Sequence, residues 1–134
     1  MSPEVVARKK EHLYTYLKDL RKFEHCSFEE FKKHHYEIER LLELIIEFAS
    51  DITFHILSKK DDSVPSSYRM GFLRLGELNL ISKNLASHLS NMVGMRNIIV
   101  HGYEVVDNEI IYQSIKQILQ DIPQFLNEIE SIEL

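Results

Sequence analysis

A cluster of side chains suited to acid–base and anion-binding chemistry lies near the C-terminal third of the chain. Arg96, Asn97, His101 and Tyr103 fall within eight positions, threaded through aliphatic residues. A guanidinium presents a planar fork of donors that matches phosphate oxygens, and an imidazole that titrates near neutrality serves as a general base or acid. Metal-independent cleavage of RNA needs these groups, because a 2′-hydroxyl must lose a proton, a 5′-oxygen must gain one, and charge on the phosphorane must be stabilised.

These residues lie at the end of a predicted amphipathic helix that begins near Ser82. Its apolar stripe consists of Leu85, Leu89, Met92, Val93 and Val100. Arg96 falls within this stripe, and a cation there must be paired, or must border a solvent-filled groove or a subunit seam. Gly102 suits the left-handed position that ends a helix, which places His101 in the last turn.

Helical geometry separates the arginine from the histidine. Asn97 and His101 are four residues apart and share a face, whereas Arg96 and His101 are five apart and rotated by roughly 140°. The two side chains of one chain therefore do not converge on one atom unless the helix unwinds at Gly102. Two copies across a twofold axis would bring them together, so we expect a homodimer in which Asn97 orients His101 or hydrogen-bonds the phosphate. The alternative is that Arg96, Asn97 and His101 form a polar seam across the interface without catalysis.

The stretch Arg96-Asn97-Ile98-Ile99-Val100-His101-Gly102-Tyr103 resembles the R-N-x-x-x-H-x-Y signature of the HEPN superfamily, specifically its HepT-like toxin branch. This resemblance implies a metal-independent endoribonuclease toxin that works as a homodimer on an RNA substrate, with Arg96, His101 and Asn97 at the catalytic site. It also implies a nucleotidyltransferase antitoxin of the MntA kind that adenylylates Tyr103. The alternative within the same superfamily is a catalytically inactive module for dimerisation or partner binding. The sequence shows no nucleophile constellation, phosphate loop or cofactor box, so no cofactor is expected.

The remaining pattern predicts an all-α, up-and-down helical bundle with four long helices and one short one. The expected helices run from Ser2 or Pro3 to about Phe23, from Ser27 to about Ser58, from Tyr68 to Leu78, from Ser82 to the motif, and from Asp107 or Asn108 onward. The second of these opens with a capping box, Ser27-x-x-Glu30. The last carries an apolar stripe from Ile111 to Ile129, and Pro123 should kink it. The resemblance implies the same fold, and residues 1–134 are expected to form one domain.

Two other groups of polar residues invite a functional interpretation. Asp51 and His55 are one turn apart, and form either a local hydrogen-bonded pair or a pair that orients His101 or Arg96. His35 and Glu39, beside His34, have the spacing of metal ligands, but no second ligand cluster accompanies them, so no metal site is predicted.

Composition sets bounds on the cellular context. The single cysteine, Cys26, excludes an intrachain disulfide and is typical of a reducing cytoplasm. No apolar run approaches the ~18 residues of a membrane span. The net charge of −5 predicts modest, site-restricted RNA binding rather than a broad basic surface.

Overall fold

The computed structural model describes residues 3–61, 64–100 and 108–133, with Val100 described by its backbone alone. Within these residues the chain forms six α-helices and no strand. They are α1 (Pro3–Arg21), α2 (Phe28–Lys33), α3 (His35–Lys60), α4 (Tyr68–Glu77), α5 (Lys83–Val100) and α6 (Asn108–Ile129). The predicted all-α bundle is confirmed. Helices α1, α4 and α5 all lie within one or two residues of their expected bounds.

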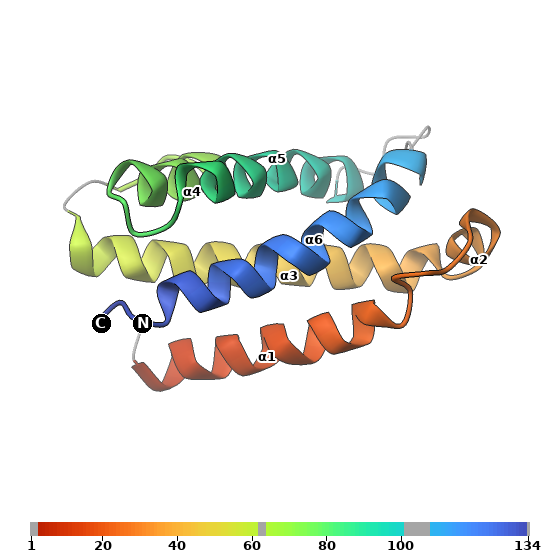
Figure 1. Ribbon diagram of the computed structural model, residues 1–134, viewed down its shortest axis with the longest axis horizontal. Helices are drawn as coiled ribbons and strands as arrows, with labels where there is room; N and C mark the ends of the chain where they lie inside the picture. The colour runs from red at the N-terminus through yellow and green to blue at the C-terminus, as the bar shows by residue number, and fades with distance from the viewer. Residues whose placement is uncertain (1–2, 62–63, 101–107, 134) are drawn as a thin grey trace.

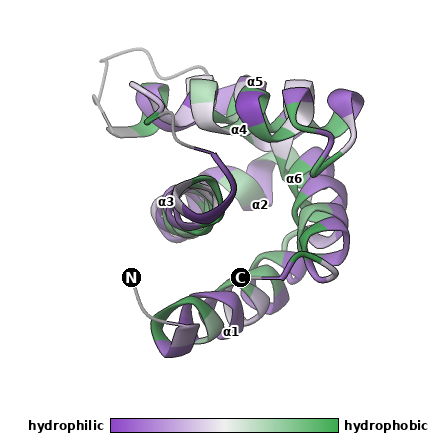
Figure 2. Cartoon of the chain, turned by 90° about the vertical axis from the view of Figure 1, so that its left-hand side faces the viewer, coloured by the Kyte–Doolittle hydropathy of each residue, from purple (hydrophilic) through white to green (hydrophobic). Residues whose placement is uncertain are grey.

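Helix α3 packs against α1, α2, α4 and α5. Viewed along the helices, it has α1 on one side and α4 and α5 on the other, while α6 lies across from it and packs on α1 and α5 (Figure 2). The C-terminal end of α5 and the start of α6 lie at the same end of the bundle as α2 (Figure 1). Among the residues described, no helix has the length and apolar character needed to cross a membrane.

Helix α6 carries the strongest amphipathic pattern of the predicted helices, and its stripe is buried as expected. The buried residues of the stripe are Ile111, Ile115, Ile118, Leu119, Ile122, Phe125, Leu126 and Ile129. The helix continues through Pro123 to Ile129. Asp107, the alternative first residue of this helix, lies outside the described part of the chain.

The expected helix from Ser27 to Ser58 is wrong in one respect, because it is broken at His34. Ser27 caps the first piece as predicted, with its Oγ accepting from the Glu30 backbone N–H at 3.1 Å. At His34 the backbone leaves helical geometry, with φ −117° and ψ 18°. The break lets the short α2 pack across the end of the bundle.

The contacts of α2 explain why one straight helix does not form. The rings of Phe28 and Phe31 lie 5.4 and 5.5 Å from that of Tyr112 on α6. The Tyr112 hydroxyl donates to the Cys26 carbonyl at 2.7 Å. Phe31 is fully buried by this packing. A straight helix would carry both phenylalanines away from α6, so burial of aromatic surface favours the bend.

Serine caps fix the N-terminal ends of α5, which carries Arg96 and Asn97, and of its neighbour α4. The Ser67 and Ser82 hydroxyls accept from the backbone N–H groups of Met70 and Leu85, each at 3.2 Å. Between α4 and α5, Asn79 adopts a left-handed φ of 57° and reverses the chain. The result is an antiparallel α4–α5 pair, in which α4 lies beside the helix that ends in the motif.

Candidate functional site

Arg96 lies in the last two turns of α5 and is held against an aromatic ring of α4. Its guanidinium carbon is 5.3 Å from the centroid of the Tyr68 ring. The electron-rich face of the ring attracts the cation, so part of the cost of placing a charge in an apolar stripe is offset. The expectation that Arg96 needs a partner or a groove is therefore met in part by Tyr68.

The Arg96 side chain nevertheless retains one unused donor. Its Nε is buried and has no hydrogen-bond partner within the residues that the structure describes. Leaving a buried donor unsatisfied costs roughly 1–3 kcal/mol. A group that carries this cost is poised for an acceptor such as a phosphate oxygen.

A second aromatic residue supports Tyr68 from α3. The ring centroids of Phe54 and Tyr68 are 5.5 Å apart. Gly71 on α4 makes room for this packing, because a Cβ at that position would lie 2.9 Å from Cε1 of Phe54. We call Tyr68 and Phe54 the aromatic shelf. It joins α3 and α4 beneath the arginine. It could not be predicted from the sequence, because it depends on the packing of two helices.

Asn97 follows Arg96 on α5 but points in a different direction. The asparagine is exposed, whereas Arg96 is half-buried. Because α5 remains helical to Val100, the two side chains are separated by about 100° around the helix axis. His101, Gly102 and Tyr103 lie outside the described residues. The predicted positions of the histidine in the last turn, and of the glycine as the helix stop, therefore remain predictions.

Asp51 and His55 make their contacts on the side of α3 that faces α1. A carboxylate oxygen of Asp51 lies 2.9 Å from Nζ of Lys9, which forms an ion pair with it. His55 is buried, with 5% of its surface exposed. Arg96 instead lies over Tyr68 of α4. The structure thus gives Asp51 a structural partner other than Arg96, while a role of either residue toward His101 remains a prediction.

Burial gives His55 a specific pH dependence. Removal from water lowers the pKa of its imidazole below the usual value, and the nearby positive charges of Lys59 and Lys10 act in the same direction. The unfolded chain therefore binds a proton at a higher pH than the folded protein does.

We expect the free energy of unfolding to decrease as pH falls below the ordinary histidine pKa of about 6.5. His55→Gln should reduce this decrease, because the buried group then no longer titrates. Urea unfolding at about pH 7.5 and about pH 5.5 measures the effect. His25→Gln is the matched control, since the His25 side chain is 82% exposed. An equal loss of stability in the wild type and the His55 variant would contradict the prediction.

The histidines near the start of α3 make local pairs. Nδ1 of His35 lies 2.6 Å from a carboxylate oxygen of Glu39, one turn along the helix. His34 packs near the ring of Phe23, with the centroids 5.6 Å apart. In the described part of the chain, no group of three or more histidine, cysteine, aspartate or glutamate side chains is arranged to hold a metal ion.

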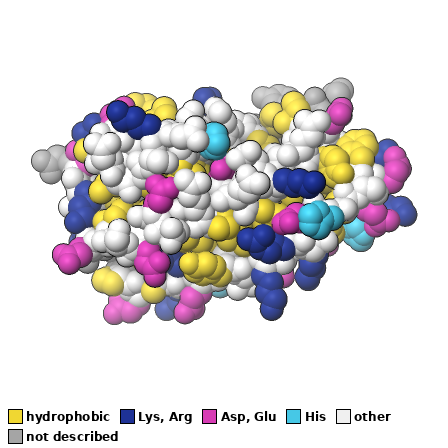
Figure 3. All heavy atoms as spheres, viewed as in Figure 1, with side chains coloured by type: hydrophobic (Ala, Val, Ile, Leu, Met, Phe, Trp, Pro, Cys, Tyr) yellow, Lys and Arg dark blue, Asp and Glu magenta, His cyan; other side chains and the backbone are white. Residues whose placement is uncertain are grey.

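Charge on the surface follows no single pattern. On the face shown in Figure 3, lysine and arginine side chains are interspersed with aspartate and glutamate. The described residues also contain ion pairs one helical turn apart, such as Lys32 with Glu29 at 2.9 Å and Arg74 with Glu77 at 2.9 Å. Positive charge for an anionic ligand is therefore best supplied at a defined point such as Arg96.

Fold and site together define a class of protein: a small helical bundle that presents an arginine with an unused donor near the end of its fifth helix. Residues 13–129 match the family described as Ribonuclease HepT-like. The chain belongs to this family, a HepT-like branch of the HEPN superfamily, as the motif predicted.

Two curated relatives are named as nucleases. The tRNA nuclease HepT of Aphanizomenon flos-aquae is 31% identical over 134 residues, which cover 98% of this chain and 91% of that protein. The mRNA nuclease HepT of Shewanella oneidensis is 34% identical over 90 residues, which cover 67% of this chain and 68% of the relative.

Solved structures share the whole fold. The tri-AMPylated HEPN toxin of Shewanella oneidensis, in complex with an MNT antitoxin, matches with a TM-score of 0.86 and 27% identity, covering 98% of this chain and 99% of the other. A toxin–antitoxin complex with AMP-PNP matches with a TM-score of 0.84 and 26% identity, covering 97% and 100%. The likeness confirms the HEPN-type bundle.

The aromatic shelf leads to a testable expectation about the site. Tyr68→Leu should lower any activity that depends on Arg96 by roughly 2–5-fold, because a cation–π contact of about 0.5–1 kcal/mol is lost and the guanidinium is less well held. Tyr68→Phe keeps the ring face and should retain nearly full activity. Steady-state cleavage kinetics on an RNA substrate measure both variants, alongside thermal unfolding. Equal activity in the leucine and phenylalanine variants would show that the shelf does not position Arg96.

Proposed function

We propose that this protein is a metal-independent endoribonuclease toxin whose activity a nucleotidyltransferase antitoxin controls. The observation that carries the proposal is the buried Arg96 Nε without a partner among the described residues, in a stretch that reads as the HepT-like motif. Membership in the HepT-like ribonuclease family supports an RNA substrate. The relatives named as tRNA and mRNA nucleases support the same class of substrate.

In the proposed reaction the RNA supplies its own nucleophile. A histidine at position 101 takes the proton of a 2′-hydroxyl, and the 2′-oxygen attacks the adjacent phosphorus. The bond to the 5′-oxygen breaks, and that oxygen receives a proton from an imidazolium. The products are a 2′,3′-cyclic phosphate and a 5′-hydroxyl. Arg96 holds the phosphorane oxygens through its planar fork, and Asn97 orients the imidazole or donates to the phosphate.

A homodimer would place both functional groups at one site. Arg96 leans onto α4 while Asn97 is exposed on another side of α5. The four-residue spacing in the sequence predicts that His101 shares the side of Asn97. The arginine of one chain and the histidine of another can meet across a twofold axis, which also supplies one imidazole as base and a second as acid. We therefore propose a composite site at the interface of two copies.

The structural relatives support a proposal for the partner and its chemistry. One is a tri-AMPylated toxin in complex with an MNT antitoxin, and another is a toxin–antitoxin complex with AMP-PNP. For this chain we propose a nucleotidyltransferase antitoxin that transfers adenylyl groups from ATP to Tyr103. The transfer forms a phosphodiester on the tyrosine oxygen and releases pyrophosphate.

The proposed function is tested by incubating the purified protein with RNA in the presence of EDTA. We expect cleavage to persist, because no step needs a metal ion, and the fragments to end in 2′,3′-cyclic phosphates. His101→Ala should be inactive, and light scattering should give twice the chain mass of 15.8 kDa.

Three results would contradict all or part of this scheme. Cleavage that stops on chelation would indicate a metal-dependent reaction. A dimer that binds its antitoxin but leaves RNA intact would instead favour the catalytically inactive dimerisation module. A monomer that cleaves RNA would exclude the composite site but not the activity.

A further inference from the structure

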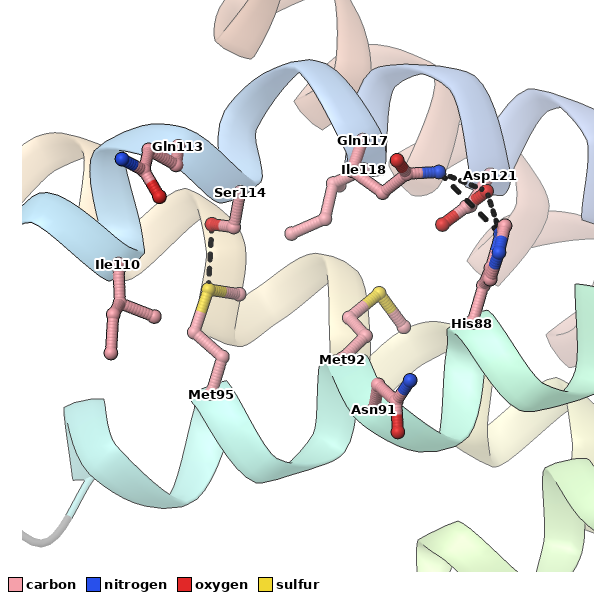
Figure 4. A pocket seen from close by; sticks show the side chains of 10 residues that line it. All are labelled: His88, Asn91, Met92, Met95, Ile110, Gln113, Ser114, Gln117, Ile118 and Asp121. Atoms are coloured by element: carbon pink, nitrogen blue, oxygen red, sulfur yellow. Dashed lines mark hydrogen bonds and ion pairs between the residues drawn. The ribbon is translucent and has the colours of Figure 1, made fainter.

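A cavity of about 290 Å³ lies between α5 and α6, on the two helices that flank the motif. Its walls include the side chains of Met92 and Met95 from α5 and of Ile110 and Ile118 from α6 (Figure 4). We call it the α5–α6 pocket. Its volume is near the lower end of the range for small-molecule sites, which suits a ligand about the size of one nucleoside.

One end of the α5–α6 pocket holds a polar network built on a buried carboxylate. Asp121 is only 4% exposed and interrupts the apolar stripe of α6. Its Oδ1 accepts from Nε2 of Gln117 at 2.9 Å and lies 3.2 Å from Nδ1 of His88 (Figure 4). None of these three residues has a part in the proposed cleavage of RNA.

This network leaves hydrogen-bonding groups available to a ligand. With Nδ1 of His88 donating to Asp121, Nε2 is the free ring nitrogen. Gln117 uses its amide nitrogen toward Asp121, so its amide oxygen is free to accept. The exposed Asn91 amide adds a donor and an acceptor at the rim, with no hydrogen-bond partner recorded for it in the described segments. Hydrogen-bond donors and acceptors of these kinds match those on the edge of a nucleobase.

The apolar walls suit the faces of the same ligand. Thioether sulfurs make favourable contacts with aromatic rings and adapt to their shape, and Met92 and Met95 line the pocket together. The pocket is also next to the motif. Arg96 directly follows Met95 and lies one helical turn beyond Met92, so a base in the pocket is within the reach of a nucleotide chain whose phosphate binds Arg96.

We propose that the α5–α6 pocket binds a single nucleobase. The source of that base rests on the proposed function. One source is an unpaired base of the RNA substrate near the cleaved bond, and the other is the adenine of an adenylyl group on the protein. In both cases Gln117 and Asn91 contact the base edge, the two methionines contact its face, and Asp121 holds His88 and Gln117 in place.

Methionine methyl groups give a direct probe. In protein labelled with ¹³C at the methionine methyls, we expect the Met92 and Met95 signals to shift on addition of at least one of AMP, GMP, CMP and UMP. Met70, which is 53% exposed on α4, serves as an internal control and should not shift. Ribose 5-phosphate, which lacks a base, should shift none of them.

Matched glutamine variants test the residues. Gln117→Ala should weaken the binding roughly tenfold, as expected for the loss of one good base-edge contact. Gln120→Ala should have no effect, because Gln120 is an exposed glutamine on the same helix and does not line the pocket. Absence of shifts with all four nucleotides, equal shifts at Met70, or equal binding by the two variants would overturn the proposal.

Two further arms identify the source of the base. Shifts with a 2′-deoxy-substituted, uncleavable RNA indicate a substrate base, and the Gln117→Ala enzyme should then show a weaker base preference beside the cut. Shifts after modification by the antitoxin indicate the adenylyl group. Nucleotide-induced shifts in a protein without nuclease activity would sustain the pocket and contradict the proposed function. A protein that cleaves RNA but shows no nucleotide-induced shifts would contradict the pocket and leave the proposed function standing.

Discussion

Replacing Arg96 with methionine is expected to abolish RNA cleavage while making the folded protein more stable. The arginine Nε is buried without a partner among the described residues, and its removal should recover about 1–3 kcal/mol. Loss of the stacking on Tyr68 offsets about 0.5–1 kcal/mol of this gain. A methionine fills a similar volume without a polar atom. The net effect should be a rise of about 1 kcal/mol in the free energy of unfolding.

Activity should change in the opposite direction and by much more. Removing a donor that stabilises transition-state charge typically lowers the rate by 10²–10³-fold, and Arg96 supplies a whole cation. We therefore expect at least a ~10³-fold loss in the cleavage rate. Arg96→Lys keeps the charge but not the planar fork, and should also be strongly impaired. Urea unfolding and cleavage assays on the same preparations measure both quantities.

The opposed changes distinguish a functional arginine from a structural one. If Arg96 served only to hold the bundle together, Arg96→Met would lower the free energy of unfolding. The cleavage rate would then fall only in proportion to the fraction of folded protein. Mixing Arg96→Met and His101→Ala chains adds a test of the composite site. Restored activity in the mixed dimers would show that one arginine and one histidine from different chains suffice, and that the second imidazole is dispensable. Mixed dimers that stay inactive would indicate that both imidazoles are needed.

The second large effect concerns Tyr103. Modification by the antitoxin is expected to silence cleavage without unfolding the protein. An adenylyl group adds bulk and a phosphodiester charge beside the motif, and this anion can pair with the fork of Arg96 in place of the RNA phosphate. Tyr103→Phe removes the acceptor oxygen, so this variant should stay active when the antitoxin and ATP are present. Its intrinsic cleavage will fall only to the extent that the hydroxyl contacts the substrate.

Intact-mass spectrometry after co-expression with the antitoxin measures the modification. The wild type should gain mass in AMP-sized increments and lose its cleavage activity, whereas Tyr103→Phe should do neither. Tyr112→Phe is a suitable control, since the Tyr112 hydroxyl donates to the Cys26 carbonyl and is not free for transfer. Increments that persist in the Tyr103 variant would place the modification at another residue.

Sequence periodicity predicted the bundle well wherever burial alone decides the structure. The stripe of α6, the cap at Ser27 and the short helix from Tyr68 were all foreseen, because they depend on residues close together in the chain. The break at His34 was not foreseen. Its cause is the packing of Phe28 and Phe31 on Tyr112, about eighty residues further along.

The candidate site was predictable in its residue types but not in its support. Arg96 was conspicuous as a cation in an apolar stripe, which called for a partner, a groove or a subunit seam, and the motif resemblance then favoured a functional site. The ring beneath it could not be inferred, since Tyr68 and Phe54 look like ordinary bundle aromatics until α3 and α4 are placed side by side. The polar network at Asp121 could not be inferred either. Asp121 is buried on α6, and its partner His88 lies 33 residues away in the sequence.

The aromatic shelf has a consequence for transplanting this activity. Arg96 rests on Tyr68, Tyr68 on Phe54, and Phe54 occupies the space that Gly71 leaves free. Three helices thus contribute one continuous stack, and only one of its members belongs to the motif. Grafting Arg96 through Tyr103 onto the end of a helix in another bundle would transfer the motif residues without the aromatic side chains that support Arg96. A working graft must carry positions 54, 68 and 71 as well, and among natural variants these three positions should change together with one another rather than singly.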